Sequence, residues 1–272
     1  MGANLKEMIE LNREQYILAE PFIYEITCDS IYPCSIIEGN QQGRIFADSI
    51  VYPRTVLFWH YCGFAYIVGD TENVEFNKQI YRFLTGVFEE NQRRFVLFVN
   101  DEKWRNIVNK MTEINHIIQS GNRIMFCFNK GKFRTENFDI PEEYEAAEID
   151  ANLLKRLQGK IIPSFSWHTP DTFFNAGKGF CLINKKNKDI ACSSFSSCIA
   201  NGKIDIGVET NPEYRRKGLG TIVAAQMVKY VLDKGYEPDW GCNSNNTGSA
   251  SIARNLGFEE HGVHSTYIIK TS

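Results

Sequence analysis

A short stretch near residue 215 combines basic side chains with two glycines directly before a helical pattern. Arg215, Arg216 and Lys217 are followed by Gly218 and Gly220. The first N–H groups of a helix have no intrahelical partner, and the helix dipole favours an anion at that end. Glycine removes the Cβ that would keep a phosphate away from those donors. The stretch therefore predicts a binding site for a phosphate or pyrophosphate.

A strand and a helix must position this turn. Residues 203–210 suit a pleated strand that ends before Pro212, because proline cannot donate to a sheet ladder. From Leu219 onward, apolar residues recur at the three-and-four spacing of one helical face: Ile222, Val223, Met227, Val228 and Val231. The basic residues and glycines thus lie where a strand turns into a helix N-terminus.

The order of residues in this turn separates several kinds of nucleotide site. A P-loop would place its lysine after the glycines, and a dinucleotide fingerprint would need three glycines. The string from Arg215 to Gly220 instead fits Arg/Gln-x-x-Gly-x-Gly/Ala, and it resembles the coenzyme A pyrophosphate loop of the GNAT (Gcn5-related N-acetyltransferase) superfamily. A basic helix cap without a ligand is the alternative interpretation.

The residues after this helix extend the resemblance. Residues 240–243 read as a short strand, Asn246 follows, and residues 249–256 read as a helix that ends at Gly257-Phe258. This order is similar to that of GNAT proteins, and the phrases Glu-Tyr-Arg-Arg-Lys-Gly-Leu and Trp-x-Cys resemble bacterial acetyltransferases of the zwittermicin A resistance type. The resemblance covers residues 145–272. It implies an α+β (mixed α/β) chain with a GNAT fold in its C-terminal half.

The resemblance also implies a cosubstrate, acetyl-CoA, and the residues that would bind it. The main chain of Val208 and Thr210 would bond the pantetheine arm, and Asn246 would contact the cofactor or cap its helix. The turn would supply the remaining contacts: Arg215, Arg216, Lys217, Gly218, Leu219, Gly220 and Thr221.

Catalysis would be direct attack of a neutral amine on the thioester, which requires a base. Glu209 is the first candidate, with Asp205 second; a solvated carboxylate, or a partner for Arg215 or Arg216, is the alternative for Glu209. The tyrosine that many GNAT enzymes use as an acid falls at Ala253 here. Ser249, Ser251 or Tyr267 would replace it, or no acid would be needed.

The N-terminal half shows an order of elements similar to a second GNAT-like domain. We expect a helix over residues 4–19, strands at 43–49, 56–61 and 63–68, a helix at 76–89, a strand at 94–99, a helix at 102–111 and a strand at 123–128. The matching strand-to-helix turn, residues 68–75, is acidic and would repel a pyrophosphate. This predicts a degenerate GNAT-like domain that walls the substrate pocket or mediates formation of a homodimer. An unrelated α/β domain is the alternative.

The acidic, proline-containing residues 138–148 suggest the domain boundary, which divides the chain into residues 1–143 and 144–272. In the second domain we expect a helix at residues 151–157, an irregular aromatic segment at 163–175, and strands at 179–184, 190–199 and 203–210.

Composition narrows the classes of partner. The formal net charge of −3 gives no global basic field for nucleic acid or an anionic membrane. Eight cysteines without a Cys-x-x-Cys pair argue against a metal site, and Cys127, inside an apolar strand, should be a buried thiol. The absence of a signal peptide and of an 18-residue apolar run predicts a cytoplasmic protein.

Together these features predict an acetyl-CoA-dependent N-acetyltransferase that acts on a small-molecule amine, without a metal. Two alternatives stay open. One is a catalytically silent acyl-CoA-binding protein with the same fold, and the other is a protein or peptide N-acetyltransferase.

Overall fold

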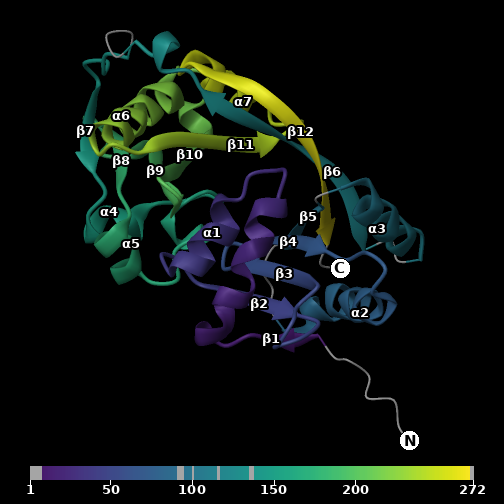
Figure 1. Cartoon of the computed structure of the whole chain (residues 1–272). Coiled ribbons are helices and arrows are strands. Elements are labelled where there is room, and N and C mark those ends of the chain that lie inside the picture. The colour runs from purple at the N-terminus through teal and green to yellow at the C-terminus, as the bar shows by residue number, and fades with distance from the viewer. Residues whose placement is uncertain (1–7, 91–94, 100, 115–116, 135–137, 270–272) are drawn as a thin grey trace, which may run out of the picture. The chain divides into compact units, whose positions relative to one another are not determined.

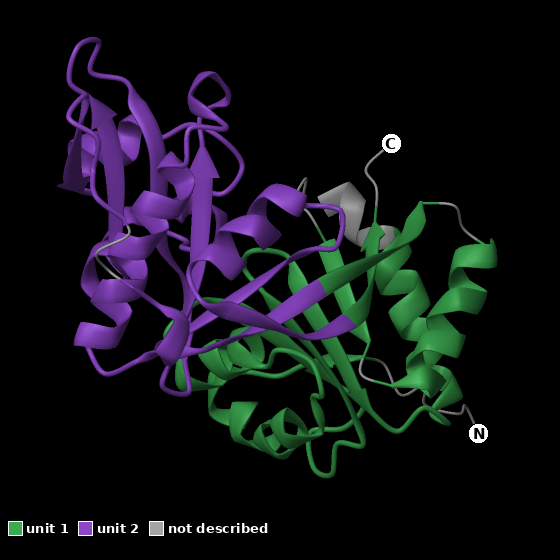
Figure 2. Ribbon diagram, turned by 90° about the horizontal axis from the view of Figure 1, so that it is seen from above, with its two compact units in different colours: residues 1–123, 264–272 green, residues 124–263 purple. Residues whose placement is uncertain are grey.

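A computed structural model describes residues 8–90, 95–99, 101–114, 117–134 and 138–269. The chain forms two compact units (Figure 2). Unit 1 contains Met1–Arg123 and His264–Ser272, and unit 2 contains Ile124–Val263. Among the helices of the described residues, none is long and apolar enough to cross a membrane.

Unit 1 is built on a sheet of strand order β1-β2-β3-β4-β5-β12. Its strands and α-helices, labelled in Figure 1, are β1 (Ile9–Glu10), α1 (Ile31–Glu38), β2 (Gly43–Ala47), β3 (Thr55–His60), β4 (Phe64–Gly69), α2 (Val74–Glu90), β5 (Phe95–Val99), α3 (Glu102–Ile114), and parts of β6 (Ile118–Phe128) and β12 (Phe258–Ile269). Two 3-10 helices, Arg13–Leu18 and Glu20–Glu25, lie between β1 and α1. Strands β2, β3 and β4 form an antiparallel meander, and β4 pairs in parallel with β5.

The predicted helix over residues 4–19 is wrong where the structure describes it, and residues 4–7 lie outside the described residues. Ile9 and Glu10 pair antiparallel with Ala47 and Phe46 of β2, so sheet pairing overrides the local periodicity. A 3-10 helix follows, because Asn12 and Gln15 cap each other's backbone N–H groups. Helix α1 was missed; its Pro33 is the third helical residue, where proline costs no hydrogen bond.

The core of unit 1 lies between its sheet and helices α2 and α3. Phe76, Ile80 and Leu84 share one face of α2 and are buried against sheet residues such as Leu97. Trp104 of α3 packs in the same cluster. These helices confirm the three-and-four spacing read from the sequence.

In unit 2 the sheet strands follow the order β6-β11-β10-β9-β8-β7. Its elements are β7 (Tyr144–Glu148), α4 (Ala151–Arg156), a 3-10 turn (Pro163–Phe165), α5 (Pro170–Ala176), β8 (Gly179–Asn184), β9 (Ile190–Ala200), β10 (Lys203–Thr210), a 3-10 turn (Pro212–Tyr214), α6 (Leu219–Asp233), β11 (Glu237–Asn243) and α7 (Thr247–Asn255). Met227, Val228 and Val231 of α6 pack with Trp240 of β11 to form its main core. Part of the segment expected to be irregular is helix α5, which begins with a capping box at Thr169.

The units divide at different positions from the boundary suggested by composition. Strand β6 crosses from unit 1 into unit 2 after Arg123, and β12 crosses back after Val263. Within residues 138–148, Tyr144–Glu148 forms β7 and pairs antiparallel with β8. A polar composition is compatible with a linker, but it is also compatible with an edge strand, which can be polar on both faces.

Cys127 is exposed, so its predicted burial is wrong. It lies on β6 between Phe126, which is buried, and Phe128. Alternate residues of a strand point to opposite faces of the sheet, and an apolar run does not reveal which face is covered.

Candidate coenzyme site

The candidate site begins where β10 turns into α6. After Thr210 the chain makes the 3-10 turn Pro212–Tyr214, and Asn211 caps that turn by accepting from the Glu213 N–H. Arg216 has φ 62° and Gly218 has φ 76°, both in the left-handed region. A left-handed conformation at a non-glycine residue costs free energy, and such residues gather at functional sites.

This geometry leaves a row of backbone donors without acceptors. Within the part of the chain that the structure describes, no hydrogen-bond acceptor faces the amide N–H groups of residues 216–220. The amides of Thr221 and Ile222 both donate to the Gly218 carbonyl and begin the helix. Five consecutive amides without acceptors, at the N-terminus of a 15-residue helix, are an arrangement that can bind an anion.

Strand β10 separates from β11 beside this turn. The two strands pair in parallel only at Lys203, Ile204 and Asp205, opposite Glu237, Pro238 and Asp239. On its other side β10 stays paired with β9 as far as Thr210, with a bulge between Asp205 and Ile206. From Ile206 to Thr210, the edge of β10 that faces β11 is therefore open to a ligand. Val208 and Thr210, whose main chain the resemblance would place against the pantetheine arm, lie in this stretch.

Gly220 fixes how closely the helix approaches that strand. A Cβ at this position would lie 2.9 Å from Thr210 Oγ1, 3.1 Å from Ile252 Cδ1 and 3.8 Å from Val208 Cγ1. A side chain here would displace the Thr210 and Ile252 side chains or push α6 away from β10. The absence of a side chain at Gly220 thus brings the free amides next to Val208 and Thr210, two of the predicted cofactor contacts.

The basic side chains of the turn are exposed, but two of them are anchored. Arg215 Nε donates to the Thr210 carbonyl at 3.1 Å, and its Nη2 lies 3.8 Å from Glu209 Oε1. Lys217 Nζ lies 5.1 Å from the centre of the Tyr214 ring. Tyr214 is buried, and its hydroxyl lies 3.0 Å from Asp189 Oδ2. Tyr214 is an anchor of the turn that sequence reasoning missed, although it stands next to the motif.

Glu209 makes contacts on both of its carboxylate oxygens. Oε2 accepts from the N–H groups of Lys160 and Ile161, both at 3.0 Å, and Oε1 faces Arg215. The ion pair matches the alternative role considered for this carboxylate, a partner for Arg215. The backbone contact with residues 160–161 was not foreseen, because nothing in the local sequence links segments 48 and 49 residues apart.

The three residues proposed around the short helix have different surroundings. Asn246 caps α7 by accepting from the Ser249 N–H at 3.1 Å, which confirms the capping role. The Ser249 hydroxyl accepts from Trp240 Nε1 at 3.1 Å. Ala253, where the acid of many relatives would stand, is fully buried in the core of unit 2.

Tyr267 lies in the core of unit 1, outside the unit that carries the turn. Its side chain is 2% exposed, and its hydroxyl lies 2.7 Å from Asn109 Oδ1 and 3.4 Å from the Arg105 carbonyl. Burial raises the pKa of this hydroxyl above its ordinary value. These contacts account for the residue as a structural one, and they offer no support for its role as the acid.

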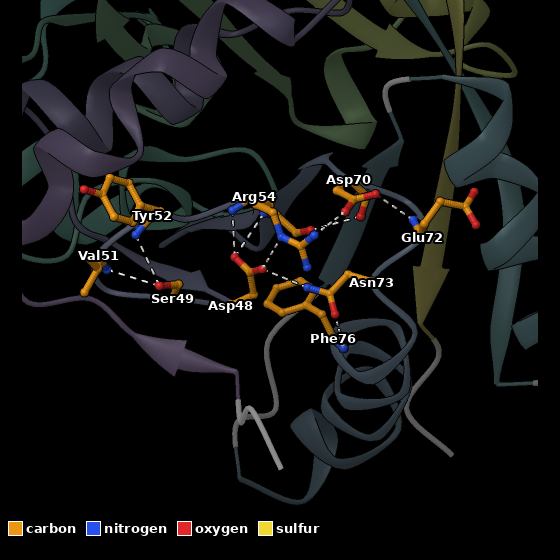
Figure 3. A network of polar contacts seen from close by, with 10 residues as sticks. Asp48, Ser49, Val51, Tyr52, Arg54, Asp70, Glu72, Asn73 and Phe76 are labelled. Carbon is orange, nitrogen blue, oxygen red and sulfur yellow. Dashed lines mark hydrogen bonds and ion pairs between the residues drawn. The ribbon is translucent and has the colours of Figure 1, made fainter. Parts of the chain in front are cut away.

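In the matching turn of unit 1, side chains of the turn accept hydrogen bonds from backbone N–H groups (Figure 3). Asp70 Oδ1 accepts from the Glu72 N–H, and Asn73 Oδ1 accepts from the Phe76 N–H, so side chains of the turn itself occupy these amides. Asp48 is buried and accepts from the Arg54 N–H and from Asn73 Nδ2, both at 2.8 Å. Arg54 in turn pairs with Asp70 at 3.2 Å.

Strands β4 and β5 of unit 1 also stay together where β10 and β11 separate. They pair in parallel from Phe64 to Ile67. The turn of unit 1 thus lacks the open strand edge, and its Glu72, Val74 and Phe76 amides already have acceptors. In the described residues, no group of three or more His, Cys, Asp and Glu side chains is arranged to hold a metal ion.

Comparison with known proteins places this geometry in context. The sequence profile described as GNAT acetyltransferase matches residues 23–267. A Bacillus subtilis (strain 168) protein described as the uncharacterized N-acetyltransferase YdfB is 22% identical over 263 residues, which cover 95% of this chain and 97% of that protein.

Solved structures share the fold over almost the whole chain. A GCN5-related N-acetyltransferase-like protein from Streptococcus suis 89/1591 superposes with a TM-score of 0.75 at 21% identity, covering 94% of this chain and 99% of that one. A tandem GNAT protein from the clavulanic acid biosynthesis pathway superposes with a TM-score of 0.62 at 9% identity, covering 98% of this chain and 99% of that one. The predicted mixed α/β fold is confirmed, and the tandem neighbour supports a two-domain arrangement.

Proposed function

The chain belongs to the GNAT acetyltransferase family, and from this premise we propose that unit 2 binds acetyl-CoA and transfers its acetyl group to the amine of a small molecule. One observation carries the proposal. The free amides of residues 216–220 lie directly beside the open edge of β10. A ligand with an anionic end and an extended, amide-containing arm would bind both features at once.

Each part of the site would have a separate task. The amides of residues 216–220 would bind the pyrophosphate, with Arg216 and Lys217 supplying positive charge. The open backbone of Val208 and Thr210 would bind the arm as an added strand would. A backbone donor at that edge would stabilise the negative charge that develops on the thioester oxygen during attack. Holding amine and thioester together would lower the barrier further.

Deprotonation of the amine is assigned to a carboxylate of β10. Glu209 and Asp205 are both on this strand, and Asp205 is 8% exposed. The role of Glu209 as base stays a prediction, and the contacts of its carboxylate give it a second candidate role, argued below. Ser249 likewise stays a prediction as the acid.

A catalytically silent acyl-CoA-binding protein is the second candidate. It is favoured by the environment of Ala253, which is fully buried and provides no proton donor. Acetyl transfer without a positioned acid is still feasible when the leaving thiolate is stable enough in water. The two candidates differ only in turnover.

The experiment that tests the proposal is a panel of amines with acetyl-CoA, monitored by the release of free thiol. We expect turnover with at least one class of amine, and its loss in Gly218→Asp, because a carboxylate would then stand among the amides that bind pyrophosphate. Coenzyme binding without turnover on any amine would select the silent protein. If Gly218→Asp retains turnover, the turn of residues 215–220 does not bind the coenzyme.

Other properties belong to the same proposal. Unit 1 would bind no coenzyme, since its turn is acidic and side chains of the turn occupy the Glu72 and Phe76 amides. It would instead wall the acceptor pocket or mediate a homodimer. The zwittermicin A resistance-type subfamily and a cytoplasmic location remain predictions from the sequence.

A further inference from the structure

A short segment after α4 is bound to the end of β10 through one carboxylate. Residues 158–160 are exposed, yet the N–H groups of Lys160 and Ile161 both donate to Glu209 Oε2 at 3.0 Å. The Glu209 side chain is 17% exposed, so this contact is largely shielded from water. Two backbone donors on one carboxylate oxygen form a strong, directional attachment.

Gly159 allows the carboxylate to lie this close. Its φ is +122°, and a Cβ built there would lie 2.6 Å from Glu209 Cγ, 2.7 Å from Cδ and 2.9 Å from Oε2. Both the backbone conformation and the space therefore require glycine. The segment and the carboxylate are fitted to each other.

The segment also lies on one face of the stretch of β10 that has no ladder partner on the β11 side. A Cβ at Gly207 would lie 3.3 Å from Ile161 Cγ2, so Ile161 packs against the strand two residues before Glu209. The stretch from Gly207 to Glu209 lies within the open edge described above. Residues 158–161 thus border the place where the reactive end of the coenzyme would lie.

The other oxygen of Glu209 connects this segment to the turn of residues 215–220, where the coenzyme would bind; this turn is called the coenzyme turn below. Oε1 lies 3.8 Å from Arg215 Nη2, and Arg215 also bonds the Thr210 carbonyl. Of the described cationic side chains, Arg215 is the one with an ion pair to this carboxylate. A pyrophosphate on the turn would compete with Glu209 for the guanidinium.

We propose that Glu209 is a positioning residue that holds residues 158–161 across the acceptor side of the site and links them, through Arg215, to occupancy of the coenzyme turn. The link to the coenzyme rests on the proposed function; the attachment itself does not. In this role the carboxylate acts through the segment that it holds, and not by taking a proton from the amine.

Limited trypsin digestion without any ligand tests the attachment. Cleavage after Lys160 requires local release of the segment. We expect Glu209→Ala to be cut there about tenfold faster than the wild type. Glu209→Gln should stay near the wild-type rate, because its amide oxygen can still accept from both N–H groups. Cleavage after Lys186, in the exposed turn between β8 and β9, is the internal reference. An unchanged ratio of the two cleavages in Glu209→Ala would overturn the proposal.

A glycine pair provides a matched control. Gly159→Ala leaves the carboxylate chemically intact but displaces it, so it should expose Lys160 to trypsin as Glu209→Ala does. Gly202→Ala places a Cβ at φ +71° in open space, and so tests for a nonspecific effect of backbone strain. Equal cleavage after Lys160 in both glycine variants would count against the attachment.

Kinetics separate positioning from proton abstraction. A positioning role predicts that Glu209→Gln keeps kcat and its pH profile, while Glu209→Ala raises KM for the amine. A general base predicts a loss of about a hundredfold or more in kcat for both variants.

Digestion in the presence of acetyl-CoA tests the link to the coenzyme. The ligand should change the rate of cleavage after Lys160 in the wild type but not in Arg215→Ala. If acetyl-CoA does not bind at all, the proposed function fails while the ligand-free digestion still decides the attachment.

Discussion

At the scale of single residues, the absence of a side chain matters as much as any charged group. Gly220 and Gly248 are each the second residue of a helix, α6 and α7. A Cβ at Gly220 would lie 2.9 Å from Thr210 Oγ1, whereas at Gly248 the nearest atom would be Asn246 Oδ1 at 3.7 Å. Chemically identical positions thus have different packing requirements.

These two glycines give a matched prediction. Gly248→Ala should raise the free energy of unfolding by up to about 1 kcal/mol, because alanine is the better helix former. Gly220→Ala should lower it by about 1–2 kcal/mol, since the Cβ forces α6 from β10. Urea titration of both variants measures this. Adding Thr210→Ala to Gly220→Ala should recover part of the lost free energy of unfolding, whereas adding it to the wild type or to Gly248→Ala should not raise that free energy. A stabilised Gly220→Ala would show that the close approach is not needed.

A buried histidine of unit 1 predicts how stability depends on pH. His60 is 1% exposed, and burial lowers its pKa from 6.5 to about 3. The folded state therefore keeps this ring neutral, while the unfolded chain gains a proton as the pH falls below 6.5. His60 therefore contributes to the free energy of unfolding above pH 6.5. This contribution is lost on acidification towards pH 3, at roughly 1.4 kcal/mol per pH unit.

Replacement of His60 isolates this contribution. In His60→Asn the amide oxygen can accept from the Cys62 N–H, as Nδ1 does at 3.1 Å. Between pH 6.5 and 4.5 the wild type should lose about 2 kcal/mol more unfolding free energy than His60→Asn. His261→Asn, at an exposed histidine of unit 2, controls for loss of an imidazole. Parallel pH dependence in His60→Asn and wild type would contradict the assignment.

At the scale of elements, the sequence predicted most of what builds the site. Strand β10, the turn at Arg215, helix α6 and helix α7 all lie where apolar spacing and glycines placed them. Local patterns report local structure, and the turn from Arg215 to Gly220 is formed by residues adjacent in the sequence. The contact between Glu209 and residues 160–161, and the burial of Tyr214 against Asp189, depend on tertiary neighbours far apart in the chain. No periodicity encodes them.

Asn246 permits a test of capping against coenzyme contact. Asn246→Ala should lower the free energy of unfolding by about 1 kcal/mol, because the Ser249 N–H loses its acceptor. Asn246→Asp should retain most of the stability that the cap contributes, since aspartate also caps helices well. If Asn246 only caps, the Kd for coenzyme A should be the same in Asn246→Asp and wild type. Weaker binding in that variant, at unchanged stability, would assign a coenzyme contact as well.

At the scale of the whole molecule, two strands couple the halves of the chain. Ile124 and Phe126 of β6 belong to the core of unit 2, and Tyr267 and Ile269 of β12 belong to the core of unit 1. Residues 266–269 also pair antiparallel with β5. The composition of residues 138–148 marked a polar segment correctly, but strand exchange is a property of topology that composition does not report.

Cutting the chain at residue 143 should therefore yield no stable half. Fragment 144–272 lacks β6, and fragment 1–143 lacks the end of β12, so each leaves apolar core surface exposed. We expect both fragments to aggregate or to lack a cooperative thermal transition when expressed alone, and we expect coexpression to restore folding. A soluble, cooperatively unfolding fragment 144–272 would show that unit 2 does not need β6.

The measurement that tests the central claim most directly is calorimetric titration of coenzyme A into the wild type, Gly218→Asp and Gly235→Asp. Gly218 and Gly235 flank α6 at opposite ends, with φ of 76° and 78° and no atom within 4 Å of a built Cβ. The two variants thus carry matched backbone strain and the same new charge. We predict binding in the wild type and Gly235→Asp, and a Kd at least about tenfold weaker in Gly218→Asp, because only that carboxylate would meet the pyrophosphate. Equal affinities in the three proteins, or no binding to any of them, would contradict the assignment of the turn as the coenzyme site.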